Sequence, residues 1–309
     1  MSLELLDRLS LPGDAAKPNE DAFAHLDHAA LVLDGATPLG PSLLPGPSDA
    51  AWIAQFGARR LSAHLKEGDA PRDALKHALA DAEKSFAGLA RQPIREKWQT
   101  PCASLMMAVE LGHDHPPPRV RSTLAGEMPV AGSRVSEGQR GQEIDFLWFG
   151  DCAAIVEQDG RVEIVGETLA KRKAEAARAR LIAREKNMSS ASGVDRPEIE
   201  PLLRAARNRI NSGHNWLFTP DARAAAHVSH RTMTVQQGAL LLIASDGFTA
   251  LMSDYGRYEP QALMAAVKSG GLDVLGKELR TVEDADPLGE KFPRFKKSDD
   301  ATAVFLRVG

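Results

Sequence analysis

Five short acidic segments of the chain lie beside apolar runs, where the ends of strands are expected. They are Asn19-Glu20-Asp21, Asp34-Gly35, Gly150-Asp151, Ser245-Asp246-Gly247 and Ser298-Asp299-Asp300. Carboxylates that converge on one point repel one another, and Mg²⁺ or Mn²⁺ relieves that repulsion because these hard cations prefer oxygen ligands. One Asp-Gly pair is typical of a turn, but five acidic segments in matching surroundings predict a carboxylate-lined metal site.

The composition is that of an ordinary soluble globular protein. Of the 309 residues, 43% are hydrophobic and 26% are charged, and the formal net charge is −4. This weak negative charge gives no general attraction to nucleic acid or to an anionic membrane. The longest apolar run has about six residues, whereas a membrane-spanning helix needs about 20. The N-terminus lacks the basic start and apolar core of a signal peptide, so we expect a cytoplasmic protein.

Apolar runs and turn residues predict the elements that must position the acidic segments. Strands are expected near 21–33, with a turn around 26–28, and over 103–111, 144–149, 153–158, 161–165, 216–218, 240–244 and 301–308. Amphipathic helices are expected near 48–66, 71–91, 247–253, 259–269 and 271–284. Because consecutive strands look hairpin-connected, this order favours an α+β fold with antiparallel sheets and helices packed outside them.

Two segments depart from this pattern. Residues 112–142 are polar, contain three consecutive prolines and predict a loop insertion, in which His113-Asp114-His115 is either a solvated tract or part of a zinc site. Residues 167–213 contain two predicted helices, 167–186 and 197–211, with many arginines. Basic helix faces are usually solvated, although these could also contact an anionic ligand. The two cysteines, Cys102 and Cys152, are too few for a disulfide framework and are typical of buried thiols.

Taken in order, five motifs resemble those of the metal-dependent protein phosphatase family, type 2C. They read Asn-Glu-Asp-Ala, Val-Leu-Asp-Gly, Trp-Phe-Gly-Asp-Cys-Ala, Leu-Leu-Ile-Ala-Ser-Asp-Gly-Phe and Ser-Asp-Asp-Ala-Thr-Ala-Val, and they span residues 19 to 304. The resemblance implies a single domain over 1–309. Its fold would be a four-layer α-β-β-α sandwich of two mainly antiparallel sheets, with the helical insertion at 167–213 in place of the family's flap.

The resemblance also implies the metal ligands. Glu20 and Asp34 would hold one Mn²⁺ or Mg²⁺ ion together with the carbonyl of Gly35. Asp34 would bridge to a second ion that Asp246 and Asp299 also bind. Asp34 is therefore expected to be both a metal ligand and a catalytic residue.

A third, weaker ion is implied at Asp151, which matches a metal-supporting position of bacterial relatives. A pair of metal ions polarises phosphoryl oxygens and acidifies a water molecule, so no covalent nucleophile is required. The chain has no Cys-x5-Arg loop and no Gly-x-Ser-x-Gly elbow, in agreement with a water nucleophile.

The chain departs from the family pattern at the residue that grips the substrate phosphate. Family members usually carry an arginine four residues before the metal-binding glutamate, and Ala16 stands there. Lys17 is the nearest cation, but a lysine binds phosphate without the two-pronged geometry of arginine. Arg294 and Lys296, just before Asp299, either supply this charge or form a solvated basic turn.

A second departure lies after Asp34-Gly35. Ala36-Thr37-Pro38 replaces the usual histidine or methionine and glycines, so a histidine general acid is absent at that position and a metal-bound water could serve instead.

Three functions remain open on the sequence alone. The first is a Mn²⁺/Mg²⁺-dependent phosphatase of phosphoserine and phosphothreonine in proteins. The second is the same chemistry on a small phosphorylated metabolite, which the altered anchor and flap favour. The third is a catalytically silent binding module, which the complete set of carboxylates disfavours.

Overall fold

The computed structural model describes residues 2–112, 141–166, 181, 200–292, 294 and 296–309. The predicted loop at 112–142 therefore lies almost entirely outside the described residues, and so does its His-Asp-His tract. The predicted helix over 167–186 also lies outside them, apart from residue 181. Helix α4, Glu200–Arg207, is the described part of the predicted helix over 197–211.

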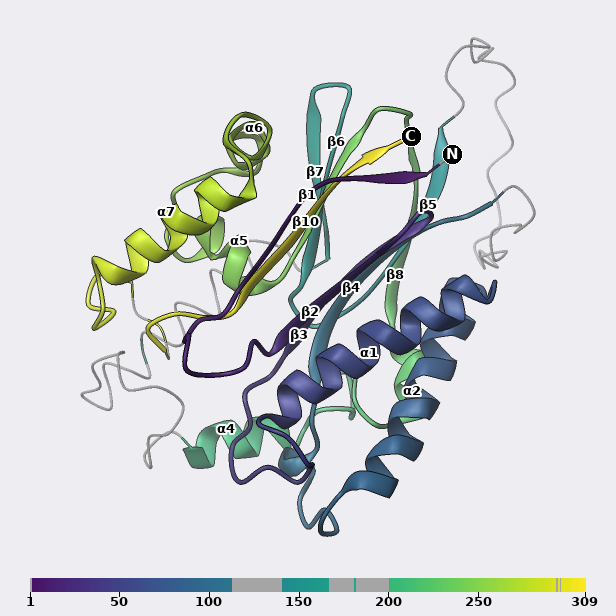
Figure 1. The fold of residues 1–309 in the computed structure, drawn as a ribbon, viewed down its shortest axis with the longest axis vertical. Helices are drawn as coiled ribbons and strands as arrows, with labels where there is room; N and C mark the ends of the chain where they lie inside the picture. The colour runs from purple at the N-terminus through teal and green to yellow at the C-terminus, as the bar shows by residue number, and fades with distance from the viewer. Residues whose placement is uncertain (1, 113–140, 167–180, 182–199, 293, 295) are drawn as a thin grey trace, which may run out of the picture.

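Two five-stranded sheets form the centre of the structure (Figure 1). The first has the order β1-β10-β9-β6-β7, with bounds Leu3–Leu11, Ala301–Val308, Leu240–Ala244, Ala153–Gln158 and Arg161–Gly166. The second has the order β2-β3-β4-β5-β8, with bounds Asp21–Leu26, Ala29–Gly35, Ala103–Glu110, Gln142–Phe149 and Ser229–Val235. All neighbouring strands are antiparallel, as predicted.

The first and last strands of the described chain form one pair. Strand β1 runs beside β10 from Leu3, opposite Val308, to Leu11, opposite Ala301. The amide of Gly309 donates to the carbonyl of Ser2 at 2.7 Å, so the two ends of the chain lie together (Figure 1).

The two sheets pack face to face. Successive residues of a strand point to opposite faces, so each strand contributes side chains to two different cores. In β3, Val32 belongs to the core between the sheets, whereas Leu31 and Leu33 belong to the core under the helices. The core between the sheets also contains Met106 from the second sheet and Ile243 from the first.

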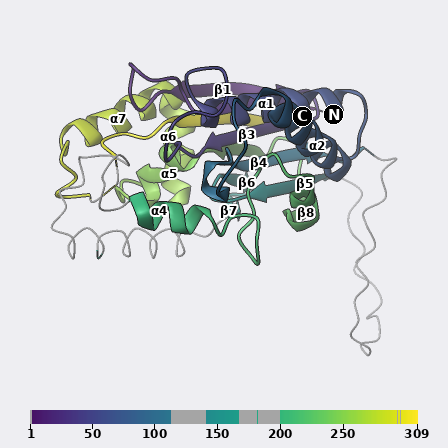
Figure 2. The same cartoon turned by 90° about the horizontal axis from the view of Figure 1, so that it is seen from below.

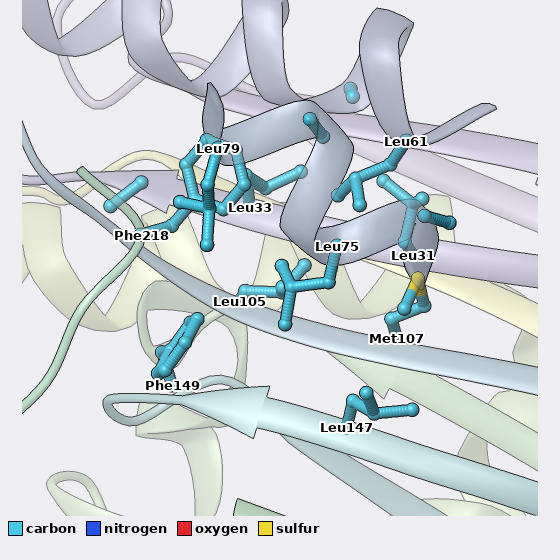
Figure 3. Packing of buried hydrophobic residues seen from close by; sticks show 14 of the residues in the cluster. Leu31, Leu33, Leu61, Leu75, Leu79, Leu105, Met107, Leu147, Phe149 and Phe218 are labelled. Atoms are coloured by element: carbon cyan, nitrogen blue, oxygen red, sulfur yellow. The ribbon is translucent and has the colours of Figure 1, made fainter. Parts of the chain in front are cut away.

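Helices cover the outer face of each sheet (Figures 1 and 2). Helices α1 (Asp49–Lys66) and α2 (Pro71–Leu89) bury leucines against the second sheet (Figure 3). Helices α5 (Asp246–Ser253), α6 (Pro260–Gly270) and α7 (Leu272–Asp284) cover the first. Among the described helices, none is both long and apolar enough to cross a lipid bilayer.

The α-β-β-α sandwich that the motifs imply is confirmed, but three details of the strand prediction are wrong. Strands β1 and β8 were not expected; both are edge strands whose residues are largely exposed or half-buried, which weakens the apolar pattern. A β-bulge between Leu5 and Asp7 disturbs the alternation of β1 further. The expected strand at 216–218 is only an isolated bridge between Phe218 and Ala103.

Replacing Leu75 with alanine should destabilise the protein through a cavity. Leu75 is fully buried between α2 and the second sheet (Figure 3), and losses of this kind lower the free energy of unfolding by about 2–5 kcal/mol. Urea unfolding measures the change. Leu202→Ala is the matched control, because Leu202 is 50% exposed in α4; a similar loss in both variants would contradict the assigned core.

Candidate metal centre

One aspartate from each acidic segment reaches a single region at the ends of the strands. Asp34 lies near the end of β3, and Asp21 begins β2 directly opposite it. Asp151 follows β5, Asp246 follows β9 and begins α5, and Asp299 precedes β10. Strands from both sheets thus supply what we term the carboxylate cluster, which consists of these five residues.

The cluster has the spacing of a metal site. One carboxylate oxygen each from Asp34, Asp151 and Asp246 lies within 4.8 Å of the other two. Asp246 is one of the residues that raise the pKa of Asp34, so the two carboxylates interact directly. Ser104 donates to Asp151 from its hydroxyl at 2.7 Å and fixes that carboxylate at the edge of the cluster.

Electrostatic repulsion perturbs the buried members of the cluster. Burial raises the pKa of Asp34 well above its usual 3.8, and the charges of Asp21, Asp246 and Asp299 raise it further. Burial also raises the pKa of Asp21, with a contribution from the charge of Asp299. A raised pKa means that the ionised form lacks stabilisation, which a bound cation would supply.

The carboxylate of Asp21 has one oxygen that could bind a metal ion. Its Oδ2 accepts a hydrogen bond from the Ser245 hydroxyl at 2.8 Å. Its Oδ1 is buried and has no hydrogen bond of normal geometry in the described part of the chain, although the Thr302 hydroxyl lies near enough to lower the pKa of Asp21. Buried polar atoms without partners are rare, and a metal ion is one of the few groups that satisfy such an oxygen. The donors are all oxygens, so the residues present fit a hard divalent cation.

Glu20, the implied ligand of the same segment, has both carboxylate oxygens in use. Its Oε2 accepts from the Thr37 hydroxyl at 2.7 Å, and its Oε1 accepts from the Ser48 hydroxyl at 2.5 Å. Its carbonyl accepts from the Gly35 amide at 3.0 Å. Ser48 is also the N-cap of α1, so Glu20 connects the start of that helix to the loop after β3.

Two glycines allow the backbone to approach the cluster closely. A Cβ atom on Gly35 would lie 2.5 Å from the carbonyl oxygen of Ala50 and 2.6 Å from that of Glu20. A Cβ atom on Gly247 would clash with the carbonyl of Asp300. Any other residue at either position would displace the backbone that carries Asp34 or Asp246.

Among the described residues, Lys296 forms an ion pair with a member of the cluster. Its Nζ lies 2.5 Å from Oδ1 of Asp299 and 3.4 Å from the Thr37 hydroxyl. Burial alone would lower the pKa of Lys296, but the charges of Asp299, Asp34 and Asp246 outweigh it and raise that pKa. Lys296 therefore stays protonated and neutralises part of the carboxylate charge.

The other two predicted phosphate anchors occupy different surroundings. The Arg294 guanidinium donates to the Asp286 carboxylate at 3.0 Å and to the Lys297 carbonyl at 2.7 Å, and its side chain is 13% exposed. It therefore holds the loop before β10 together. Lys17 is exposed, and its side chain forms no hydrogen bond or ion pair with any residue in the described part of the chain.

Two arginines of the segment 200–213 reach the loop after β3. Arg207 donates to the Thr37 carbonyl at 2.7 Å, and Arg204 donates to the Leu39 carbonyl while stacking 3.9 Å over the Trp98 ring. Arg207 also lines a cavity of about 290 Å³. The further lining residues include Glu83, Lys97, Thr100, Asp221 and Arg223.

The two cysteines lie where the sequence predicts, in the core. Cys102 and Cys152 are both buried. Burial and the neighbouring carboxylates raise the pKa of Cys152 well above its usual 9.0. Its thiol is therefore neutral near pH 7 and is no candidate nucleophile.

Asp21, a member of the cluster, and Lys296, which pairs with it through Asp299, are the two residues of the site that the sequence predicts least well. The sequence singled out Glu20 and left Asp21 without a role, although residue alternation along β2 and the pairing with Asp34 place Asp21 on the inner side. Lys296 was one of several possible anchors, since a sequence cannot show which basic residue of a turn points inward.

Comparisons with solved structures show the fold that this chain shares. No family model and no curated protein sequence matches the chain. The Mycobacterium tuberculosis serine/threonine phosphatase PstP/Ppp matches with 13% identity over 100% of this chain and 99% of that chain, at a TM-score of 0.53. The catalytic domain of PstP in complex with two manganese ions matches with 13% identity over 99% of both chains, at a TM-score of 0.50. A bacterial serine phosphatase bearing an arginine-to-alanine mutation matches with 11% identity over 100% of both chains, at a TM-score of 0.54.

The raised pKa values predict how the metal-free protein responds to pH. Between the usual 3.8 and the raised pKa of Asp34, the folded state binds more protons than the unfolded state. The free energy of unfolding should therefore fall as pH rises through that window. Asp34→Asn removes this titration and one repelling charge, so the variant should be more stable than the wild type above the window.

Thermal unfolding in excess chelator, from about pH 4 to about pH 8, measures this difference. Glu143→Gln is the control because Glu143 is an exposed acidic residue of β5. If the stability of the wild type and of Asp34→Asn depended on pH in the same way, the ionised form of Asp34 would not be destabilised in the folded protein.

Proposed function

We propose that this chain is a Mn²⁺- or Mg²⁺-dependent phosphomonoester hydrolase that acts on phosphoserine and phosphothreonine in proteins. The observation that carries the proposal is the carboxylate cluster, in which the oxygens of Asp34, Asp151 and Asp246 converge beside the unsatisfied oxygen of Asp21. The shared fold supports it, because the similar structures are serine/threonine phosphatases and one of them contains two manganese ions.

The proposed ligands divide between two principal ions. Asp34 would bridge both ions, as the resemblance implies. Asp246 and Asp299 would complete one of the two sites, and the carbonyl of Gly35 with Glu20 or Asp21 would complete the other. Of this last pair, we favour Asp21 for direct contact, because both oxygens of Glu20 already accept hydrogen bonds from hydroxyl groups. Asp151 would support a third, weaker ion.

When bound, such ions would withdraw charge from the phosphoryl oxygens and make a water molecule acidic enough to attack near neutral pH. The chain's own residues would position the reactants. Arg280 donates to the carbonyl of Asp299 at 2.8 Å and to that of Pro12 at 3.1 Å, and so fixes the backbone beside the cluster. Asp34 would orient the attacking water by accepting its proton in a hydrogen bond.

Lys296 would bind the phosphate that the missing arginine binds elsewhere in the family. In the structure its ammonium group pairs with Asp299. This ammonium group would also hold a phosphoryl oxygen of a substrate bound at the cluster. Arg294 would not serve, because its guanidinium holds the Asp286 carboxylate and four backbone carbonyls at the end of α7 and in the loop that follows.

The substrate distinguishes this proposal from its alternative, a small phosphorylated metabolite. The cavity lined by Arg207, which itself donates to the Thr37 carbonyl, is lined by both acidic and basic side chains. Such a lining suits the residues that flank a phosphorylated serine or threonine in a protein. A panel of phosphopeptides and a panel of phosphorylated metabolites, each with added Mn²⁺, would separate the two functions.

The hydrolysis of p-nitrophenyl phosphate should depend on the carboxylate cluster and on Mn²⁺ or Mg²⁺. We expect activity to vanish in excess chelator and to return with either metal. Asp34→Ala and Asp246→Ala should reduce turnover to background while circular dichroism shows an intact fold. Glu143→Gln, at the exposed acidic residue of β5, should keep wild-type activity. Full activity in chelator, or in both aspartate variants, would exclude the proposed chemistry.

Alanine substitution of the three candidate anchors should produce three different outcomes. Lys296→Ala should raise KM several-fold with a smaller change in kcat, because a charge contact to the phosphate is lost while the metal ligands remain. Arg294→Ala should chiefly lower the melting temperature, since it removes a buried ion pair with Asp286. Lys17→Ala should change neither. Steady-state kinetics and thermal unfolding measure the three effects, and a raised KM for Lys17→Ala alone would move the anchor there.

A further inference from the structure

A second group of metal-binding side chains lies where α1 ends and α2 begins. His64 belongs to the last turn of α1, Asp69 to the connection between the helices and His77 to α2. One ligand atom from each of these residues lies within 4.8 Å of the other two. Glu67 lies next to them, with its Oε2 atom 3.7 Å from Nδ1 of His64.

The carboxylate of Asp69 lies between the two imidazole rings. Its Oδ2 is 2.7 Å from Nδ1 of His77 and 3.4 Å from Nδ1 of His64. The ring centroids of the two histidines are 5.3 Å apart. Both histidines therefore direct the same ring nitrogen towards a single point beside one carboxylate oxygen.

Asp81 and Arg60 orient the ring of His64. Oδ2 of Asp81 lies 2.8 Å from Nε2 of His64 and also accepts from Nε of Arg60 at 2.7 Å. Nη2 of Arg60 lies 3.3 Å from the same Nε2, so both side chains hold this edge of the imidazole and leave Nδ1 on the side of Asp69. Burial would raise the pKa of Asp81, but the hydrogen bonds from His64 and Arg60 outweigh it and lower that pKa, so the carboxylate is ionised.

The other ring nitrogen of His64, Nδ1, faces the carboxylates of Asp69 and Glu67, at 3.4 Å and 3.7 Å. A carboxylate that holds one ring nitrogen while the other is free is the usual arrangement behind a metal-binding histidine.

We propose that His64, Asp69 and His77 form a zinc site, with Asp81 orienting His64 and Glu67 available as the fourth ligand. Zinc accepts imidazole nitrogen and carboxylate oxygen in tetrahedral geometry at about 2.0–2.2 Å, so its ligand atoms lie about 3.3 Å apart. The 3.4 Å separation from Asp69 to His64 matches this spacing, whereas the 2.7 Å separation from Asp69 to His77 is that of a hydrogen bond, which the ion would replace. Small side-chain rotations would admit the ion.

This zinc site is separate from the carboxylate cluster in place and in chemistry. Ser48, which contacts Glu20, caps the first turn of α1, and His64 lies 16 residues later in the same helix, a rise of about 24 Å. Mg²⁺ and Mn²⁺ favour oxygen ligands, whereas two imidazoles favour zinc. Zinc bound here would tie the last turn of α1 to α2 and so stabilise the pair of helices that covers the second sheet.

Zinc binding to the whole protein in excess Mg²⁺ tests the site. Mg²⁺ competes for the carboxylate cluster but not for imidazole, and a chromophoric chelator reports the zinc that the protein takes up. We expect one zinc ion per chain and a higher melting temperature with zinc. His77→Ala should lower the zinc affinity at least about tenfold, and Asp81→Asn by about 10- to 100-fold. His77 is exposed, so its replacement should leave the fold intact.

His214→Ala is the matched control, because His214 is an exposed histidine distant in sequence from α1 and α2. It should bind zinc as the wild type does. Substitution by Co²⁺ should give the visible absorption of a tetrahedral, nitrogen-containing site, and His77→Ala should lose it. The proposal is wrong if the wild type binds no zinc under these conditions, or if His77→Ala binds it as well as the wild type. Zinc binding that only Asp34→Ala abolishes would assign the ion to the carboxylate cluster and would equally refute this site.

Discussion

Repulsion among carboxylates at the ends of the strands is the constraint on which the rest of the structure depends. Asp21, Asp34 and Asp246 would separate if their backbones were free, because each is partly desolvated and the charges are alike. The two sheets and their helices prevent this, since the strands that carry the aspartates are pinned by apolar cores on both faces. Hydrophobic packing thus holds together carboxylates that repel one another, and a bound cation would offset this repulsion.

Hydrogen bonds to the backbone fix the positions of the segments that carry the carboxylate cluster. Asp300, the neighbour of Asp299, accepts from the amide of Gly13 and from the amide of Glu20, both at 2.6 Å. It thereby joins the segments before β2 and β10, which come from different sheets. Arg280 adds a contact from α7 to the same backbone. The backbone that carries the cluster is therefore held by side chains that hydrogen-bond to it and do not belong to the cluster.

Much of this architecture follows from local sequence pattern, and the exceptions have physical reasons. Long amphipathic helices and buried strands are predictable because a packed face imposes its period on the sequence; α1 and β3 are examples. Edge strands such as β8 carry polar residues on most positions and leave little pattern. The acidic segments predict the cluster, but Asp21 and Lys296 could be placed only from long-range geometry. The link between Asp21 and Ser245 joins residues 224 positions apart, which no local pattern encodes.

The pairing of β1 with β10 sets how the protein would respond to mechanical force. The two strands are antiparallel and their outer ends meet at Ser2 and Gly309, so tension applied at these ends acts across the pair rather than along it. Its hydrogen bonds would break one after another from the Leu3 and Val308 end, as in a zipper, instead of resisting together in shear. The break would reach Ala301 last, so Asp299 and the carboxylate cluster would be the final part of this edge to lose its shape.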